Sequence, residues 1–508
     1  METVPVAYSE LARQLKELAV LRSCAALLGW DEQTYLPPGG AEHRANQLSL
    51  LAGLCHERST NPAIQELLDQ LQDVNELGGA DSILAANVRE ARRNFERSTK
   101  LPRRLVEELT RVATLGQQAW VQARQKKDFQ LFRPWLTQMV ELKREEADAL
   151  RVADSPRYDS LLEDYEPGAT SAEVKVIFAE LREALVPLVS AIRDSGIAPD
   201  ISILERKFDV EAQKELSIEA AKLIGFDFDA GRLDVAAHPF CSGIGPGDCR
   251  LTTRYNEHHF SGSLFGTLHE AGHGIYEQGL PAADFGMGTG DACSLGIHES
   301  QSRMWENLVG RSLAFWEFFY DRTQSLFKSS LGDVSLQQFY QVINDVRPSW
   351  IRVEADEVTY NLHIMLRFEI EQALIGGDLA VDDLPGAWNE LFQRDFGMTP
   401  PDDSLGCMQD VHWSAGLFGY FPTYSLGNMY ASQFFEQANT DLGDLHEQFR
   451  RGEFAPLKEW LRSKIHVHGK RYSAPRLVEI VTGKPLSAAP LLRHLKGKVG
   501  PLYGLTAK

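Results

Sequence analysis

The chain has 508 residues, of which 43% are hydrophobic and 24% are charged, an ordinary composition for a globular protein. Its formal net charge of −19 argues against nucleic acid and anionic membrane surfaces as partners, and no apolar run approaches the roughly 18 residues that span a bilayer. The start of the chain shows no signal peptide. The six cysteines are scattered without a CxxC pair, which is typical of buried, reduced thiols rather than of cysteines that bind a metal. We therefore expect a cytoplasmic protein.

Helical periodicity dominates the first 225 residues. Apolar residues recur at helical spacing from Leu11 to Ala25. Proline and glycine in the segment Trp30–Gly40 are expected to break this first helix. The helices that the periodicity predicts in this part are 8–28, 41–58, 61–71, 82–98, 105–127, 129–153, 171–194 and 210–224.

The first strand-like sequence lies between Phe226 and Phe260. Leu251–Tyr255 is β-branched and alternating, and glycines crowd Gly243–Gly247. We therefore predict a mainly α protein with a small β-sheet, forming one unit over 1–508: helices to about 225, a sheet and a candidate metal site at about 226–320, and further helices at about 321–508. The later helices are expected near 335–344, 356–375, 384–396, 426–442, 456–464 and 474–482.

A candidate metal site lies in the stretch Thr267–Tyr276, which contains His269-Glu270-Ala-Gly-His273. On a helix, residues four apart lie on the same face, so His269 and His273 can point two imidazole nitrogens at one metal ion. Glu270 then flanks the open coordination position, as zinc-assisted peptide hydrolysis requires. The alternative interpretation is a pair of surface histidines on a helix.

A third ligand is available in the next predicted helix, which begins at Leu295. Glu299 follows His273 by 26 residues and completes a His/His/Glu set with one place left for water. A third histidine six residues after the second is excluded, because that position is Gly279.

Further motifs surround this candidate centre in the sequence. Each has a purely structural explanation when taken singly: Arg250 can pair with Asp248 or Asp356, and Trp413 can fill the core. The motifs are HPF at 238–240, DxRxT at 248–252, HExxH at 269–273, HESQ at 298–301, IRxxAD at 351–356 and GxxQDxHW at 406–413.

Taken together and in this order, the six motifs closely resemble those of the M32 family of metallocarboxypeptidases, the carboxypeptidase Taq type. The stretch Trp30–Thr34 also looks like a turn of that family, so the resemblance covers essentially the whole chain. It implies a large, two-lobed, helical zinc-peptidase fold of the neurolysin-like kind, with a deep groove. It also implies a cytoplasmic homodimer that removes single C-terminal residues with broad preference and acts poorly on proline.

The chemistry of the site follows from its residue types. One Zn²⁺ per chain, or Co²⁺ as a substitute, would be held by His269, His273 and Glu299, with Glu270 accepting the proton of the attacking water. The oxyanion needs a donor opposite the metal. Three candidates for it remain open, and the two tyrosines have core packing as their alternative explanation; the candidates are His412, Tyr420 and Tyr424.

A carboxypeptidase must also recognise the free carboxylate of its substrate. Arg352 is the first choice, because it follows Pro348 in a short non-helical link, and Arg250 is the second choice unless it braces the strand. His412 is a third possible donor to this carboxylate. The motifs add His238, Gln409 and Asp410 as further substrate-binding candidates.

Two questions stay open at this point. In several zinc peptidases an aspartate four residues after the ligand glutamate supports a histidine ligand, but here that position is Arg303, so another acid or a backbone carbonyl must take this role. The alternative functions are an oligopeptidase, a peptidase that releases dipeptides, and a non-catalytic binding protein stabilised by a metal. The presence of Glu270 argues against the last, since only catalysis needs an acid there.

Overall fold

The computed structural model describes residues 4–505, which divide into two compact units. The first unit comprises residues 4–99, 199–343 and 430–485, and the second comprises 100–198, 344–429 and 486–505. The prediction of a single peptidase unit over 1–508, with changes at about 225 and 320, stays a prediction.

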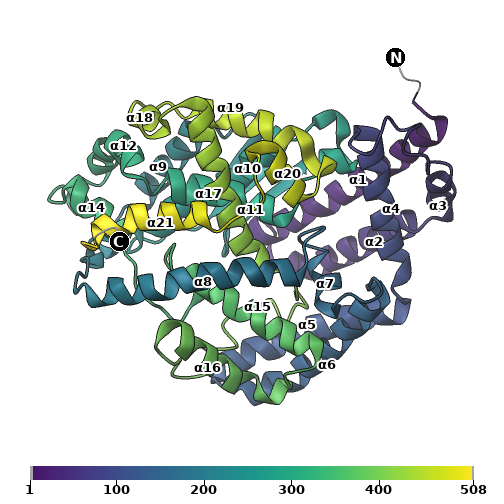
Figure 1. The fold of residues 1–508 in the computed structure, drawn as a ribbon, viewed down its shortest axis with the longest axis horizontal. Coiled ribbons are helices and arrows are strands. Elements are labelled where there is room, and N and C mark those ends of the chain that lie inside the picture. The colour runs from purple at the N-terminus through teal and green to yellow at the C-terminus, as the bar shows by residue number, and fades with distance from the viewer. Residues whose placement is uncertain (1–3, 506–508) are drawn as a thin grey trace. The chain divides into compact units, whose positions relative to one another are not determined.

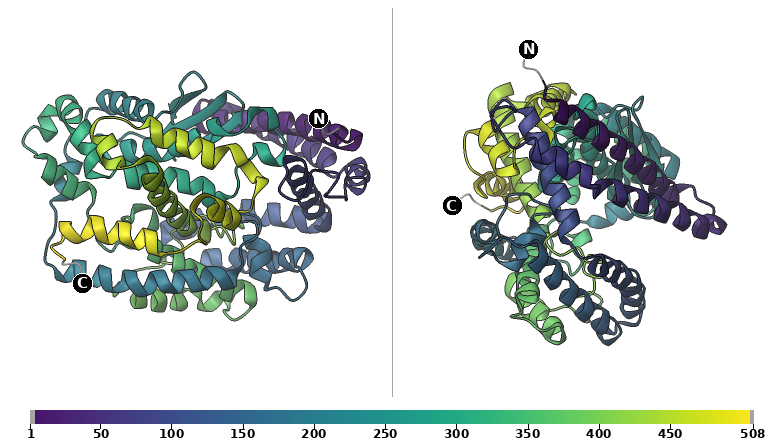
Figure 2. Two further views of the ribbon diagram at one scale, coloured as in Figure 1. Left: turned by 45° about the horizontal axis from the view of Figure 1, so that its top comes forward. Right: turned by 90° about the vertical axis from the view of Figure 1, so that its right-hand side faces the viewer.

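The first unit contains most of the helices and the sheet (Figures 1 and 2). Its α1 and α2 run side by side in these views. The helices of this unit are α1 (Val6–Thr34), α2 (Ala41–Ser59), α3 (Pro62–Asp69), α4 (Ile83–Lys100), α9 (Val210–Leu223), α10 (Phe260–Gly279), α11 (Leu295–Arg303), α12 (Leu313–Leu326), α13 (Lys328–Leu331), α14 (Leu336–Ile343), the larger part of α17 (Pro422–Leu442), α18 (Leu445–Arg450), α19 (Ala455–Lys464) and α20 (Ala474–Thr482).

The second unit is helical, and α17 begins in it. Its long helices α5 and α6 follow each other in the chain and pack against each other. Its helices are α5 (Arg103–Lys126), α6 (Phe129–Leu150), α7 (Arg157–Leu162), α8 (Ser171–Asp194), α15 (Tyr360–Gly376), α16 (Leu384–Phe396) and α21 (Ala489–Leu502).

The sheet has three strands, β1 (Gly231–Val235), β2 (Cys241–Gly245) and β3 (Asp248–Thr253), in the order β1-β3-β2. β1 pairs with β3 in parallel, with Leu233 opposite Leu251, and β2 pairs with β3 antiparallel. The predicted mainly helical class with a small sheet is confirmed. Among residues 4–505, no helix combines the length and the apolar character that crossing a membrane requires.

The first helix ends later than predicted. It does end inside the predicted segment Trp30–Gly40, but α1 continues to Thr34 instead of stopping at residue 28, and it buries Trp30 in its last turns. The reason is that a proline disfavours the helical conformation only at the residue before it. Pro37 therefore restricts Leu36 and leaves the earlier residues free to stay helical.

Several helices were not expected from the sequence, among them α12 and α21. The stretch from Leu313 to Tyr320 in α12 is apolar at every position except Glu317, so the one face that the helix buries does not stand out in the sequence. α21 contains Gly497, Gly500 and Pro501, which suggest a loop, but its Pro490 lies in the first turn, where proline is tolerated.

Helix α10 is the central element of the first unit, with Leu264, Leu268 and Ile275 in its core. Several of its glycines bring other elements very close. A Cβ on Gly274 would lie 2.6 Å from Phe226 and 2.9 Å from Leu251, so this side of α10 presses against the sheet region.

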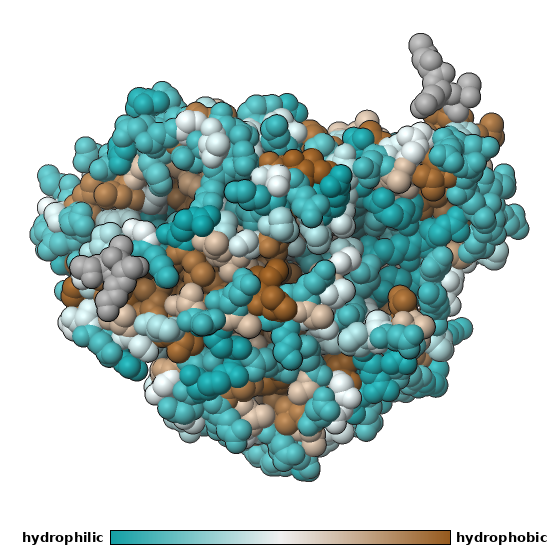
Figure 3. Space-filling view, in the orientation of Figure 1, coloured by the Kyte–Doolittle hydropathy of each residue, from teal (hydrophilic) through white to brown (hydrophobic). Residues whose placement is uncertain are grey.

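The molecular surface that Figure 3 shows is largely hydrophilic, with hydrophobic residues gathered in patches among the polar ones.

The glycine at 272 sets the contact between α10 and α11. A Cβ there would lie 2.6 Å from the carbonyl oxygen of Gln301 and 2.6 Å from Cα of Ser302, both backbone atoms of α11. Backbone cannot rotate away as a side chain can. The absence of a side chain at position 272 is therefore what lets the two helices meet.

We expect Gly272→Ala to lower the free energy of unfolding by about 1–3 kcal/mol, because overpacking forces two rigid helices apart. Gly266→Ala, on the same helix, is the matched control. Its Cβ meets nothing nearer than Oγ1 of Thr253 at 3.8 Å, so it should be neutral or up to about 1 kcal/mol stabilising. Guanidinium unfolding measures both variants. Equal midpoints for the two would contradict the close contact.

Candidate metal centre

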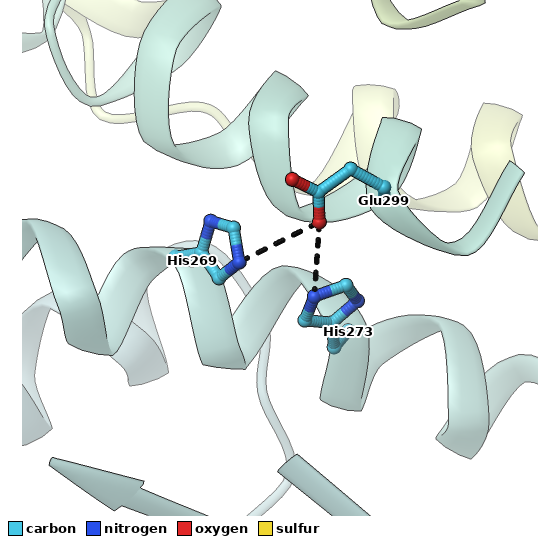
Figure 4. Close-up of side chains that lie close together, drawn as sticks. All are labelled: His269, His273 and Glu299. Atoms are coloured by element: carbon cyan, nitrogen blue, oxygen red, sulfur yellow. Dashed lines mark ion pairs between the residues drawn. The ribbon is translucent and has the colours of Figure 1, made fainter. Parts of the chain in front are cut away.

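The three predicted metal ligands meet at one point between α10 and α11. His269 and His273 lie on the same face of α10, and Glu299 reaches down from α11 (Figure 4). Oε2 of Glu299 lies 3.6 Å from Nε2 of His269 and 3.4 Å from Nε2 of His273. One ligand atom from each residue lies within 4.8 Å of the others. The three atoms therefore surround a space in which one ion would contact all of them.

The hydrogen bonds of the two histidines suit them for metal binding. Nδ1 of His269 lies 2.9 Å from Oε2 of Glu306, and Nδ1 of His273 lies 2.5 Å from Nδ1 of His298. Each ring thus uses its Nδ1 for a protein partner and presents its Nε2 to the shared space. Metal-binding histidines are held in this way, with the second nitrogen bonded to the protein. The donor set, two imidazoles and one carboxylate, fits Zn²⁺ with one position open.

Glu306 is the acid that supports a histidine ligand. In several zinc peptidases an aspartate four residues after the ligand glutamate has this role, but here that position is Arg303. Glu306 lies in a π-helical segment, Met304–Val309, that directly follows α11. Arg303 instead joins the two carboxylates: its Nε donates to Oε1 of Glu299 at 2.7 Å, and its Nη1 donates to Oε2 of Glu306 at 3.3 Å. The guanidinium therefore compensates the negative charge that the ligand carboxylate and its supporting acid bring into the interior.

This charge pattern sets the protonation of the site. Burial alone would lower the pKa of His269, but the charge of Glu299 and the hydrogen bond to Glu306 outweigh it and raise this pKa to about 9. Burial and the neighbouring His298 lower the pKa of His273 to about 3. Despite burial, Arg303 and His269 hold the pKa of Glu299 well below its usual value. The ligand carboxylate is therefore ionised throughout the physiological range.

Glu270 follows the first ligand and is 7% exposed. Burial raises its pKa to about 7, and the nearby Glu299 acts in the same direction, while His269 opposes the rise. A carboxylate with a pKa near neutrality both accepts and returns protons at that pH. Glu270 has the protonation behaviour that a general base needs.

The substrate-binding candidates Arg352, Gln409 and Asp410 come together in the second unit. Nε and Nη2 of Arg352 donate to Oδ1 of Asp410 at 3.0 and 2.8 Å, and the amide N–H of Arg352 donates to Oε1 of Gln409 at 2.8 Å. Arg367 binds the other oxygen of Asp410 through its Nε, at 2.7 Å. Two guanidinium groups thus share one carboxylate, which leaves this buried cluster with an excess of one positive charge.

The three candidates for the oxyanion donor also form one group in the second unit. Nε2 of His412 lies 3.2 Å from the hydroxyl of Tyr424, and the rings of Tyr420 and Tyr424 are 5.3 Å apart. Burial, helped by Arg352, lowers the pKa of His412 to about 4, so its imidazole is neutral at pH 7. The structure thus brings His412, Tyr420 and Tyr424 into contact with one another.

Arg250 and His238 lie in the first unit, and not in the Arg352 cluster. Arg250, on β3, donates to both carboxylate oxygens of Asp248 at 2.8 Å, and its guanidinium lies 4.3 Å from the ring of Trp30. These contacts agree with the interpretation that Arg250 braces the strand. His238 is exposed in the connection between β1 and β2.

Sequence reasoning missed three residues that support the centre and one that supports Asp410: Glu306, His298, Glu277 and Arg367. For two of them, Glu277 and Glu306, the distance along the sequence from a metal ligand could have indicated a place beside it. Glu277 follows His273 by four residues, and Glu306 follows Glu299 by seven, so each continues the helix face of a ligand. His298 was noted only as the neighbour of the third ligand, and nothing in the sequence pointed to Arg367.

Comparison with known proteins agrees with this geometry. A family model described as carboxypeptidase Taq (M32) metallopeptidase matches residues 10–499. The chain belongs to the M32 family. It is 49% identical to thermostable carboxypeptidase 1 of Thermus thermophilus, over 99% of this chain and 100% of that one. It is 40% identical to carboxypeptidase 1 of Bacillus subtilis, over 96% of this chain and 97% of that one.

Solved structures of carboxypeptidases have the same fold. The M32 carboxypeptidase from Deinococcus radiodurans R1 matches with a TM-score of 0.94 at 40% identity, over 98% of this chain and 100% of that one. Metallocarboxypeptidase 1 of Trypanosoma cruzi matches with a TM-score of 0.92 at 36% identity, over 97% and 99%. The M32 chain described here is thus a metallocarboxypeptidase with a His/His/Glu metal group, as its sequence motifs predicted.

Metal binding to this site is expected to release a proton. In the metal-free protein His269 is protonated near neutral pH because its pKa is about 9, and a metal ion binds only the neutral ring. The apparent metal affinity should therefore fall as the pH falls, about tenfold per unit below about pH 9. Calorimetric titration with Zn²⁺ in two buffers of different ionisation enthalpy should report about one proton released per chain at pH 7.5. No release would show that His269 is already neutral.

Proposed function

We propose that this M32 enzyme is a zinc-dependent carboxypeptidase that releases single C-terminal residues from peptides with broad preference and acts poorly on proline. The observation that carries the proposal is the pairing of a complete His/His/Glu ligand set with the buried acid Glu270 beside its first histidine. A metal that only stabilised the fold would need no such acid. The names of the matched relatives, which are carboxypeptidases, support the exopeptidase class.

Within this proposal each residue has a definite task. His269, His273 and Glu299 hold the metal, which when bound polarises the scissile carbonyl and makes water a stronger nucleophile. Glu270 takes the proton from the attacking water and then gives it to the leaving amine. Its raised pKa suits both steps, since it neither holds the proton too weakly nor too strongly near pH 7.

We further propose that the residues of the second unit act on the charged parts of the substrate. A neutral His412 and the hydroxyls of Tyr420 and Tyr424 can donate to the oxyanion that forms during attack. The cluster of Arg352, Arg367 and Asp410 has an excess positive charge, and a carboxylate is its natural complement. Asp410 then orients the guanidinium of Arg352, and Gln409 fixes its backbone. His238 stays a candidate for contact with substrate, without a distinct task.

The remaining expectations about the enzyme are also proposals. Zn²⁺ is the preferred ion by the ligand types, with Co²⁺ as a substitute of similar geometry. A homodimer and a cytoplasmic location follow from the family resemblance. The location is supported by the six scattered cysteines, which include no CxxC pair.

The decisive test of single-residue release uses one peptide in two forms, with a free and with an amidated C-terminus. Mass spectrometry of the products should show successive loss of single residues from the free form and little cleavage of the amide. Dipeptide products, or internal cleavage of both forms alike, would assign the enzyme to the alternative peptidase classes.

Glu270→Gln and His269→Ala should separate catalysis from metal binding. Glu270→Gln keeps all three ligands, so we expect full zinc content and a loss of kcat by about 100-fold or more, the usual range for a removed general base. His269→Ala removes a ligand and should lose both zinc and activity. Metal analysis and peptide hydrolysis measure the two effects. An active Glu270→Gln enzyme would exclude this residue as the base.

The carboxylate-binding role of Arg352 is tested against Arg250. Arg352→Lys keeps the charge but loses the two-pronged geometry, so kcat/KM for peptides with a free carboxylate should fall by at least about tenfold, with zinc content unchanged. Arg250→Lys, which retains a partner in Asp248, should change kcat/KM by no more than about threefold if it only braces β3. The reverse result would assign the carboxylate to Arg250. If neither matters, the carboxylate is bound elsewhere.

A further inference from the structure

The second histidine ligand is supported differently from the first. His269 bonds directly to a carboxylate, but His273 bonds to another histidine: Nδ1 of His298 lies 2.5 Å from Nδ1 of His273. The other nitrogen of His298, Nε2, lies 2.7 Å from Oε1 of Glu277. The three side chains form a continuous line from the ligand, on α10, through α11 and back to α10.

The donors and acceptors along this line have only one arrangement that permits metal binding. His273 must offer the lone pair of Nε2 to the metal, so its proton is on Nδ1 and is donated to His298. Nδ1 of His298 must then be an acceptor, which places the proton of this ring on Nε2. That proton is donated to Glu277, whose carboxylate can only accept. The carboxylate thus selects the tautomer of His298, and His298 selects the tautomer of His273.

The carboxylate of Glu277 fits beside strand β2 because residue 243 is a glycine. A Cβ on Gly243, in strand β2, would lie 2.4 Å from Oε2 and 2.9 Å from Cδ of Glu277. The carboxylate therefore occupies the space that a side chain at position 243 would take. Glu277 and His298 also border a pocket of about 430 Å³ beside the centre, so the line ends where its carboxylate is partly accessible.

We propose that His298 and Glu277 are positioning residues, which hold His273 in the tautomer and orientation that bind the metal. Glu277 acts only through His298, so its effect depends on that ring. Glu306 acts on His269 by a separate contact, so the two histidines are supported by two independent arms. This inference rests on the proposed metal centre and deepens it.

The test measures the Zn²⁺ dissociation constant by competition with a chelator, for the full chain and its variants. Glu277→Ala and His298→Phe should each weaken Zn²⁺ binding by about 10–100-fold, the usual range for loss of a residue that supports a ligand. The double variant should bind Zn²⁺ as His298→Phe does, within about twofold. Glu306→Ala is the matched control, and its loss of affinity should be the same in the wild-type and His298→Phe backgrounds.

Two further measurements separate positioning from a general loss of structure. The unfolding midpoints of the metal-free variants should stay close to that of the metal-free wild type. Gly243→Ala changes no polar group, yet it displaces the carboxylate of Glu277 and should also weaken Zn²⁺ binding, so it tests the proposal even if His298→Phe fails to fold. The absorption spectrum of the Co²⁺ form should change in Glu277→Ala, since the orientation of a ligand changes.

The outcomes are distinct. Unchanged Zn²⁺ affinity in Glu277→Ala overturns the proposal, and so does a Glu277→Ala effect that persists in full when His298 is phenylalanine, because Glu277 would then act by its charge alone. If the wild-type chain itself fails to bind Zn²⁺, the proposed function fails instead.

Discussion

The structure depends on the close approach of α10 and α11 at Gly272. The two imidazoles of α10 supply only two of the three protein ligands. The third, the carboxylate of Glu299, lies on a different helix, which must bring it close enough to coordinate the same ion. A side chain at position 272 would collide with the backbone of Gln301 and Ser302. The glycine directly before the second histidine of the HExxH motif is therefore as necessary for the geometry as the histidines are.

Placing these acids in the interior has an electrostatic cost, and the fold offsets this cost with arginines that lie next to them. The carboxylate of Glu299 is buried and that of Glu306 is partly buried, and Arg303 lies between them with a hydrogen bond to each. Arg311 adds a second positive charge near Glu306, at 3.7 Å. An unpaired buried charge would be strongly destabilising, whereas paired and hydrogen-bonded ones are tolerated. Glu270 is not paired in this way, which is why its pKa rises and its proton becomes available.

A different charge arrangement characterises the second unit. There two guanidinium groups, those of Arg352 and Arg367, share the single carboxylate of Asp410. The metal centre thus pairs the carboxylates of Glu299 and Glu306 with Arg303 and Arg311, while this cluster has two guanidinium groups for one carboxylate. The first arrangement suits the binding of a metal ion, and the second suits the proposed binding of a substrate carboxylate.

The sequence by itself determined the helical class, the family and the ligand set. Helical periodicity and the spacing of His269, His273 and Glu299 are local properties, so they can be read along the chain. The spacing of Glu277 and Glu306 from the ligands is compatible with shared helix faces, but it does not determine their bonds. Only the tertiary structure decided that Glu306 supports His269, that His298 connects His273 to Glu277, and that Arg352 is held by Asp410. These contacts join residues from different helices or loops, and which atoms meet depends on packing and rotamers rather than on spacing. For the same reason Arg250, equivalent to Arg352 as a motif arginine, is found on a strand, bonded to Asp248, in a different unit of the chain.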